Sequence, residues 1–321
     1  MKQYFWPPLF IFIFALLLRV YNLSNIPSGL QLDEINVGYQ GYKIIQTGSD
    51  IFGNSLPLYI DRFGDYRPAG VFYLTGIFTS LFGLNDFFIR FPIALFGALT
   101  VFPLYFLSLL ISKNKLVALF SAFLLAVSPW HIVASRATSE SIIALFFTII
   151  GVTLLLFAIK KQKAKFLILT SIFLAISYFF YHTPRVFIPL FILIAVLWVY
   201  YTYSVDKVKN LIIRRRYPLL ILVFFLALSI GISLTKAGIG RFQQTSIFGS
   251  SDVISKIKAL EDGEKGNIPL ARIFHNKPIM FSKAIVDQYL TYFSTQFLYM
   301  RGGLPIRYTV NDIGLSYYIE L

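Results

Sequence analysis

Long apolar runs recur along this chain, and they constrain its fold more than any other feature. A helix needs roughly 20 apolar residues to cross the hydrocarbon core of a bilayer. Seven segments of about that length lie at 7–24, 92–111, 116–134, 141–159, 165–181, 186–203 and 217–235. With 57% hydrophobic and 14% charged residues, the chain is predicted to be an all-α polytopic membrane protein with about seven transmembrane helices.

The basic excess of the chain has its own explanation in a membrane protein. The 29 Lys and Arg outnumber the 15 Asp and Glu, which in a soluble domain would suggest nucleic-acid binding. Here the basic residues form short clusters between apolar runs, as cytoplasmic loops do, so we expect no nucleic-acid partner. The absence of cysteine excludes disulfides, thiol catalysis and Cys-ligated zinc.

Charge also decides the place of a shorter apolar segment, Gly70–Leu84. If it crossed the membrane, the basic loops at Lys113–Lys115, 160–165 and 207–216 would lie opposite the N-terminus. If it lies on or dips into the outer leaflet, all three loops join Lys2 on the cytoplasmic side, as the positive-inside rule expects. The second arrangement also places 14 of the 15 acidic residues outside, and we adopt it.

This topology predicts two regions in a multi-pass protein of the cell membrane. A transmembrane core at 1–235 contains a long first external loop, about 25–91, that bears juxtamembrane helices. A second external region at 236–321 contains interfacial helices.

Three predicted external loops contribute acidic and basic residues at the mouths of the spans. Along the chain these are Asp33, Glu34, Asp65, Arg67, Arg90, Arg136, Glu140, His182 and Arg185. Most of them also have a structural explanation. Asp33 and Glu34 could cap a helix that begins at Asp33, and Arg136 and Glu140 could form a solvated pair on one helix. Arg90 and Arg185 could contact lipid headgroups, and His182 could be an interfacial histidine hydrogen-bonded to backbone.

Together on one face, these residues suit a lipid-linked phosphate substrate. Arginine forks hold phosphate oxygens, while a carboxylate removes a proton from the attacking acceptor. Asp65, Glu140 and His182 could ligate a divalent cation that shields the leaving phosphate. The Tyr and Phe residues at the span ends suit both interfacial anchoring and an acyl-chain groove.

The order of several motifs resembles a known family. LDE is followed by DYRP, IRFPIALFGALTV, SPWHIVASRATSES, YHTPRVFIPL and, near the end, YFSTQFLYMRGGLPIRYTVNDIG. This order is similar to that of the bacterial dolichyl-phosphate-mannose protein mannosyltransferase-like family, glycosyltransferase family 39 of the GT-C superfamily. The lipid A aminoarabinose transferases are relatives of that family.

The resemblance implies a GT-C fold and an inverting transfer of one sugar from a polyprenyl phosphate to a protein, lipid or glycan on the external face. Asp33 would be the catalytic base or acceptor-positioning acid, with Glu34 beside it. Arg67, Arg136 and Arg185 would bind the donor phosphate. Glu140 would match the acid of the second external loop.

The chain departs from the family pattern in three respects. Arg67-Pro68-Ala69 stands where relatives usually have Lys before a double proline, and Gly302-Gly303 stands where many have Gly-Asp. Relatives are usually longer, so we expect a fragment or a shortened homologue, for which an inactive relative is one alternative. The other is a transporter or lipid flippase component, which would place ionisable residues inside its spans.

Overall fold

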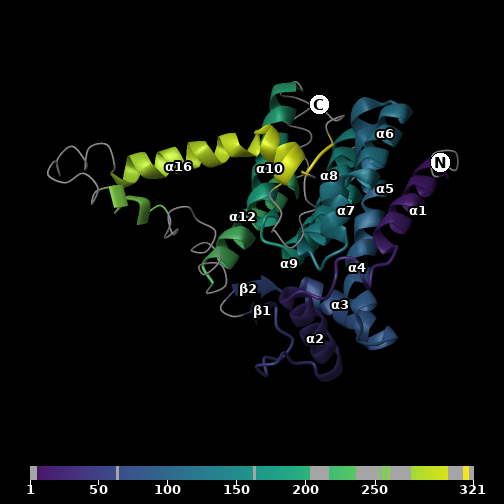
Figure 1. Cartoon of the computed structure of the whole chain (residues 1–321). Helices are drawn as coiled ribbons and strands as arrows, with labels where there is room; N and C mark the ends of the chain where they lie inside the picture. Colours follow the sequence, from purple (N-terminus) through teal and green to yellow (C-terminus); the bar gives the residue numbers. More distant parts are fainter. Residues whose placement is uncertain are drawn as a thin grey trace. The chain divides into compact units, whose positions relative to one another are not determined.

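The computed structural model describes residues 6–62, 65–161, 164–202, 217–235, 253, 255–257, 259–260, 276–302 and 314–317. The described chain is mostly helical (Figure 1). Its helices are α1 (Trp6–Val20), α2 (Leu32–Thr47), α3 (Gly70–Phe82), α4 (Asp86–Leu99), α5 (Val101–Ser112), α6 (Lys115–Val127), α7 (Pro129–Ser135), α8 (Glu140–Lys161), α9 (Ala164–Phe180), α10 (Pro184–Thr202), α12 (Tyr217–Ser233), α16 (Lys277–Tyr292) and the π-helix η3 (Gln296–Arg301). Two short strands, β1 (Tyr59–Arg62) and β2 (Asp65–Pro68), pair with each other.

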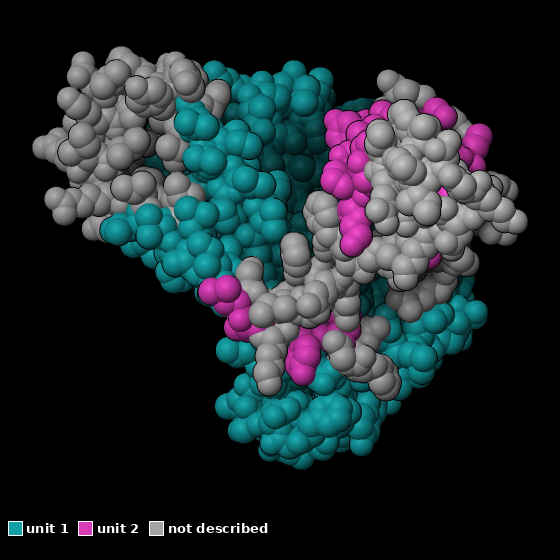
Figure 2. Space-filling view, turned by 90° about the vertical axis from the view of Figure 1, so that its left-hand side faces the viewer, with its two compact units in different colours: residues 1–62, 67–231 teal, residues 63–66, 232–321 magenta. Residues whose placement is uncertain are grey.

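The chain divides into two compact units, which Figure 2 shows in different colours. The first comprises residues 1–62 and 67–231, and the second comprises residues 63–66 and 232–321. In the second unit, a helix is present where one was predicted, as α16 and η3, and its place at the membrane interface stays a prediction. The basic loop at 207–216, Gly303 and most of the polar stretch 252–267 lie outside the described residues.

Helix length supports fewer spans than the apolar pattern predicts. Among the described residues, the segments Asp86–Ser112 and Glu140–Ala158 are long and apolar enough to cross a membrane. A third span would combine α6 and α7, which meet at a 55° bend. The bend falls at Ser128, which has ψ 125 because the following proline disfavours the α-helical conformation. The other apolar helices are shorter, so the prediction of about seven spans is not confirmed.

The first loop folds back on itself as a tight pair of helices. The helix predicted to begin at Asp33 is present as α2 and begins one residue earlier, at Leu32. It packs on α3 through Gly41 and Gly76, where a Cβ on either glycine would overlap the backbone of the other helix. Only glycine permits this approach. The position of the 13-residue α3 at the outer leaflet stays a prediction.

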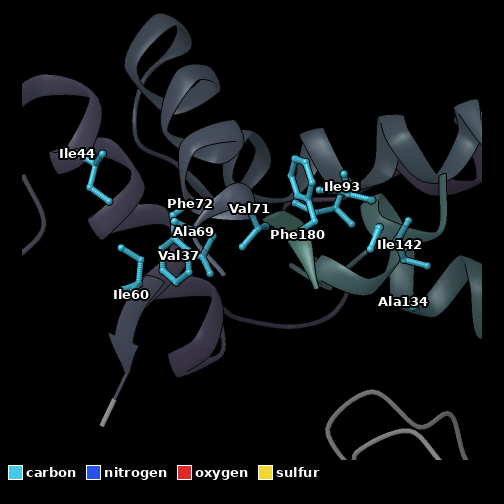
Figure 3. Close-up of a cluster of buried hydrophobic side chains, with 12 residues drawn as sticks. Val37, Ile44, Ile60, Ala69, Val71, Phe72, Ile93, Ala134, Ile142 and Phe180 are labelled. Atoms are coloured by element: carbon cyan, nitrogen blue, oxygen red, sulfur yellow. The ribbon is translucent and has the colours of Figure 1, made fainter. Parts of the chain in front are cut away.

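One buried apolar cluster joins the first loop to the helices behind it. It runs from Ile44 on α2 through Phe72 on α3 to Ile93 on α4 and Ile142 on α8 (Figure 3). All four side chains are at most 2% exposed. This cluster therefore packs α2 and α3 against α4 and α8, the helices that carry the polar residues Glu34, Arg90 and Glu140.

Candidate active site

Glu34 and Arg90 form an ion pair that is completely enclosed by protein. Nε and Nη2 of Arg90 donate to the two carboxylate oxygens of Glu34, both at 2.9 Å, and both side chains are 0% exposed. Glu34 also accepts the backbone N–H of Gln31 at 2.9 Å. This bond closes the first turn of α2, as the glutamate of a capping box does.

The rest of the Arg90 guanidinium holds the loop between α1 and α2. It donates to the carbonyls of Leu23, Pro27 and Gly29 at 3.0, 2.9 and 2.6 Å. With Glu34, these acceptors use a guanidinium's whole donor capacity. The catalytic role expected for Glu34 is therefore corrected, because its carboxylate is sealed in a contact that fixes the fold of the first loop.

Asp33 lies beside Glu34 in sequence but faces another direction. Successive residues of a helix are about 100° apart, and Asp33 is partly exposed whereas Glu34 is buried. As the second residue of α2, its carboxylate lies near the positive end of the helix dipole. Asp33 thus keeps the access to solvent that a catalytic base requires.

Arg67 and Glu140 bring two predicted external loops into contact. Arg67, on β2, donates to a carboxylate oxygen of Glu140, the first residue of α8. Their side chains are 19% and 13% exposed. One predicted phosphate ligand and the predicted second-loop acid therefore form a single, partly accessible ion pair.

Arg185 is held at the start of α10 by contacts with the first and third of the predicted external loops. Its guanidinium donates to the Tyr59 hydroxyl at 2.6 Å and to Nδ1 of His182 at 2.8 Å, and it lies 5.2 Å from the centroid of the Tyr59 ring. Since a guanidinium only donates, the proton of a neutral His182 lies on Nε2. Burial raises the pKa of Tyr59, and the charge of Arg185 opposes that rise.

The two strands align these contacts beside one another. Tyr59 lies on β1 and Arg67 on the paired β2, so the hairpin contacts the first turns of both α8 and α10. The amino ends of helices present unpaired N–H groups and positive dipole ends. Arg67 is neutralised by Glu140, so the Arg185 guanidinium and the amino end of α10 are the groups here that can attract an anion.

An apolar cavity of about 420 Å³ opens beside these residues, between α5, α7, α8 and α10. Its lining includes Ser141 and Pro184, the sequence neighbours of Glu140 and Arg185. From Ser141 the lining continues along α8 to Val152, a distance of about 16 Å at the α-helical rise. The deeper wall is apolar except for Thr148, whose hydroxyl donates to its own helix.

Arg136 has a different position from the one that its spacing suggested. It lies in the turn between α7 and α8, so it does not share a helix with Glu140. It is 8% exposed and donates to the carbonyls of Leu18, Arg19 and Ile26 at 2.9–3.0 Å. The first two bonds satisfy carbonyls at the end of α1 and the third holds the loop that follows, so we correct the expected phosphate role of Arg136 to a structural one.

The buried contact between Arg19 and His131 was not predicted from the sequence. Arg19 is fully buried and donates to Nδ1 of His131 at 2.8 Å and to the carbonyls of Ala15 and Ala126, each at 3.0 Å. The available signal was an arginine inside the first apolar run, since an ionisable group there needs buried partners. Arg19 joins the ends of α1 and α6.

The three residues predicted to hold a metal ion do not fit one in this arrangement. Glu140 is paired with Arg67, and Nδ1 of His182 accepts from Arg185. Among the residues that the structure describes, no group of three or more His, Asp or Glu side chains could hold a metal ion.

The comparisons with known proteins agree with the fold and with the motifs. Solved structures with this fold include AglB, an oligosaccharyltransferase from Archaeoglobus fulgidus in complex with an inhibitory peptide and a dolichol-phosphate. The TM-score is 0.51 and the sequence identity is 15%, and the match covers 92% of this chain and 38% of that one. Another is the Archaeoglobus fulgidus oligosaccharyltransferase in complex with Zn and sulfate, at TM-score 0.53 and 15% identity over 91% and 40%. The chain spans about two-fifths of their length. A search of curated proteins found no match.

The sequence itself matches a family model over residues 66–232, which is more than half of the chain. That model is described as dolichyl-phosphate-mannose-protein mannosyltransferase. The matched range contains β2 from Tyr66 onward and the helices from α3 to α10, and so includes Arg67, Glu140 and Arg185. The resemblance seen in the motifs is confirmed, and the chain belongs to the dolichyl-phosphate-mannose-protein mannosyltransferase family.

Proposed function

We propose that this protein is a membrane glycosyltransferase that moves one sugar from a polyprenyl-phosphate donor to an acceptor on the external face of the membrane. The observation that carries the proposal is the apolar cavity beside Arg185 and the Arg67–Glu140 pair. A polyprenyl phosphate consists of a long apolar chain, which matches the apolar cavity, and an anionic head, which matches the arginines beside it. Membership of the family supports this donor class.

The donor phosphate would bind where the hairpin meets α8 and α10. Arg185 is only 7% exposed, and its Nε has no acceptor among the described residues. A buried N–H without an acceptor is costly, and a phosphate oxygen would satisfy it. Arg67 would exchange Glu140 for a second phosphate oxygen, because a partly exposed ion pair is weak enough to be replaced.

The prenyl chain would occupy the cavity between α8 and α10. Its length along α8 and its apolar wall suit several isoprene units, and burial of their surface contributes about 25 cal/mol per Å². The sugar would then lie outside the cavity mouth, toward the acceptor.

Asp33 would act as the base on the acceptor side. It would take the proton of the acceptor hydroxyl or amine as that atom bonds to the anomeric carbon. The bond from the anomeric carbon to the phosphate oxygen breaks, and the polyprenyl phosphate leaves with the electron pair. Attack from the face opposite the phosphate inverts the anomeric configuration.

The transporter alternative draws no support from the buried arginines. Arg19, Arg90 and Arg136 each donate to backbone carbonyls, and Arg90 is also paired with Glu34. These contacts explain the buried charges as structural links between helix ends, without a translocation path.

The test of the donor site measures bound lipid in the purified protein by mass spectrometry, with added polyprenyl phosphate as the probe. We expect Leu145→Trp, which fills the cavity, to lose the bound lipid. The matched control, Leu197→Trp, changes an exposed position of α10 that does not line the cavity and should retain it. Equal binding by both variants would exclude the cavity as the donor site.

The test of the chemistry is Asp33→Asn in a membrane-based assay of sugar transfer at matched protein levels. Loss of the base should reduce turnover by roughly 10²–10⁴-fold while polyprenyl phosphate still binds. Near-normal turnover would remove Asp33 from the mechanism and leave the donor site intact.

A further inference from the structure

A second apolar hollow lies between the first turns of α1 and α6. It has a volume of about 800 Å³, within the range of roughly 300–1,000 Å³ typical of ligand sites, and its walls include Phe10 and Ile11 on α1 and Phe120 and Phe123 on α6. The one hydroxyl in its lining, on Ser121, donates to its own helix at Val117. The groove therefore presents an apolar surface that suits a hydrocarbon chain.

A basic turn forms the rim of this groove. Lys113 and Lys115 flank Asn114 in the connection from α5 to α6, and Leu116, directly after Lys115, lines the groove. The Ser112 hydroxyl accepts the N–H of Asn114 at 3.1 Å, and the Asn114 side chain accepts the N–H of Leu116 at 2.8 Å. These bonds fix the turn, so the backbone of both lysines is held at the end of the groove.

A second pair of lysines, Lys160 and Lys161, lies near the end of α5. The ammonium group of Lys160, near the end of α8, donates to the carbonyl of Leu110 near the end of α5. Lys161 follows it, and neither connecting stretch, 112–116 or 158–165, contains an acidic residue. On the side of α5 and α6, the described residues beyond the groove therefore carry basic and no acidic side chains, which favours an anionic headgroup.

We propose that the groove binds an anionic phospholipid, with an acyl chain between α1 and α6 and its phosphate on Lys113 and Lys115. Charge complementarity at the rim selects the headgroup, while the apolar walls accept the chain. This lipid site is built from α1, α6 and the turn before α6, whereas the proposed donor site is built from α8, α10 and the hairpin. The two are therefore independent.

The binding experiment compares phosphatidylglycerol with phosphatidylcholine of the same acyl chains, added to the purified protein in detergent. Bound lipid is counted by native mass spectrometry, and the melting temperature is recorded alongside. We expect phosphatidylglycerol to bind and to raise the melting temperature, and phosphatidylcholine to do neither. Equal binding of the two lipids would overturn the proposal.

The headgroup contact is tested with Lys113→Asn combined with Lys115→Gln. Lys113 has φ 56, a left-handed conformation that asparagine tolerates well, so the turn should survive the loss of charge. Affinity for phosphatidylglycerol should fall roughly 30-fold, at about one kcal/mol per lysine. The control, Lys43→Gln with Lys277→Gln, removes the same charge from α2 and α16 and should leave the affinity within about twofold. Wild-type affinity in the rim variant would refute the headgroup site.

The chain contact is tested with Ser121→Trp, which fills the groove and leaves every lysine in place. We expect the bound phosphatidylglycerol to be lost. Ile111→Trp, at an exposed position of α5 outside the groove lining, is the control and should retain it. If Ser121→Trp instead dissociates a dimer without changing lipid binding, the groove holds a second copy of the chain and the proposal is wrong.

Discussion

Two arginine–glutamate pairs tie the first loop to the helices behind it, and they differ in their access to solvent. The Glu34–Arg90 pair is 0% exposed on both sides, and its arginine is surrounded by backbone carbonyls. The Arg67–Glu140 pair is 19% and 13% exposed and lies beside a cavity. The same two residue types therefore serve a structural link in one place and a candidate binding site in the other.

Burial and the number of hydrogen-bond acceptors around the arginine decide the role of such a pair. A sealed pair with every donor used cannot exchange partners, because either charge left alone would be buried without compensation. A partly exposed pair costs little to open and can accept a ligand in place of one partner.

The largest expected effect follows from breaking the sealed pair. Glu34→Gln would leave the Arg90 charge buried without its carboxylate and should lower the free energy of unfolding by about 3–5 kcal/mol. Unfolding by denaturant in detergent micelles, followed by circular dichroism, measures the change.

Glu140→Gln is the matched control, because it removes the same charge from the open pair. Its effect on the free energy of unfolding should be about 1 kcal/mol. Equal losses in the two variants would show that the pairs do not differ in the way their exposure indicates.

Swapping the two residues of the Arg67–Glu140 pair should change the stability little and the activity strongly. Arg67→Glu combined with Glu140→Arg restores an ion pair and should return the free energy of unfolding to within about 1 kcal/mol of the wild type. Sugar transfer should stay roughly 10²-fold lower, because the cation has moved away from β2. Recovery of transfer in the double variant would show that the pair is structural and that Arg67 is no phosphate ligand.

Much of the architecture could be predicted from the sequence, because apolar periodicity and motif order are local signals. The helical class, the helix after Leu32 and the family all follow from them. The number of spans was less predictable, since apolar runs continue through breaks such as the one at Ser128.

The roles within the site could be predicted only in part. Asp33 and Glu34 are adjacent in sequence, yet one helical step separates a partly exposed carboxylate from a buried one. Arg136 and Glu140 have helical spacing, but the chain leaves α7 before Arg136 and starts α8 at Glu140. Such differences depend on contacts with distant segments, such as Arg90 and the end of α1, which spacing does not contain.

The smallest expected effect comes from Tyr59→Phe, which removes one acceptor from Arg185 and keeps the aromatic ring. The hydroxyl bond contributes about 1 kcal/mol to the free energy of unfolding, while the ring keeps its contact with the guanidinium. If Arg185 binds the donor phosphate, it needs Tyr59 only for orientation, so the KM for the donor should rise a few-fold with little change in kcat. Steady-state transfer kinetics with varied donor measure this. A loss of stability as large as that of Glu34→Gln would instead show that the Arg185–Tyr59 contact is structural, like the Glu34–Arg90 pair.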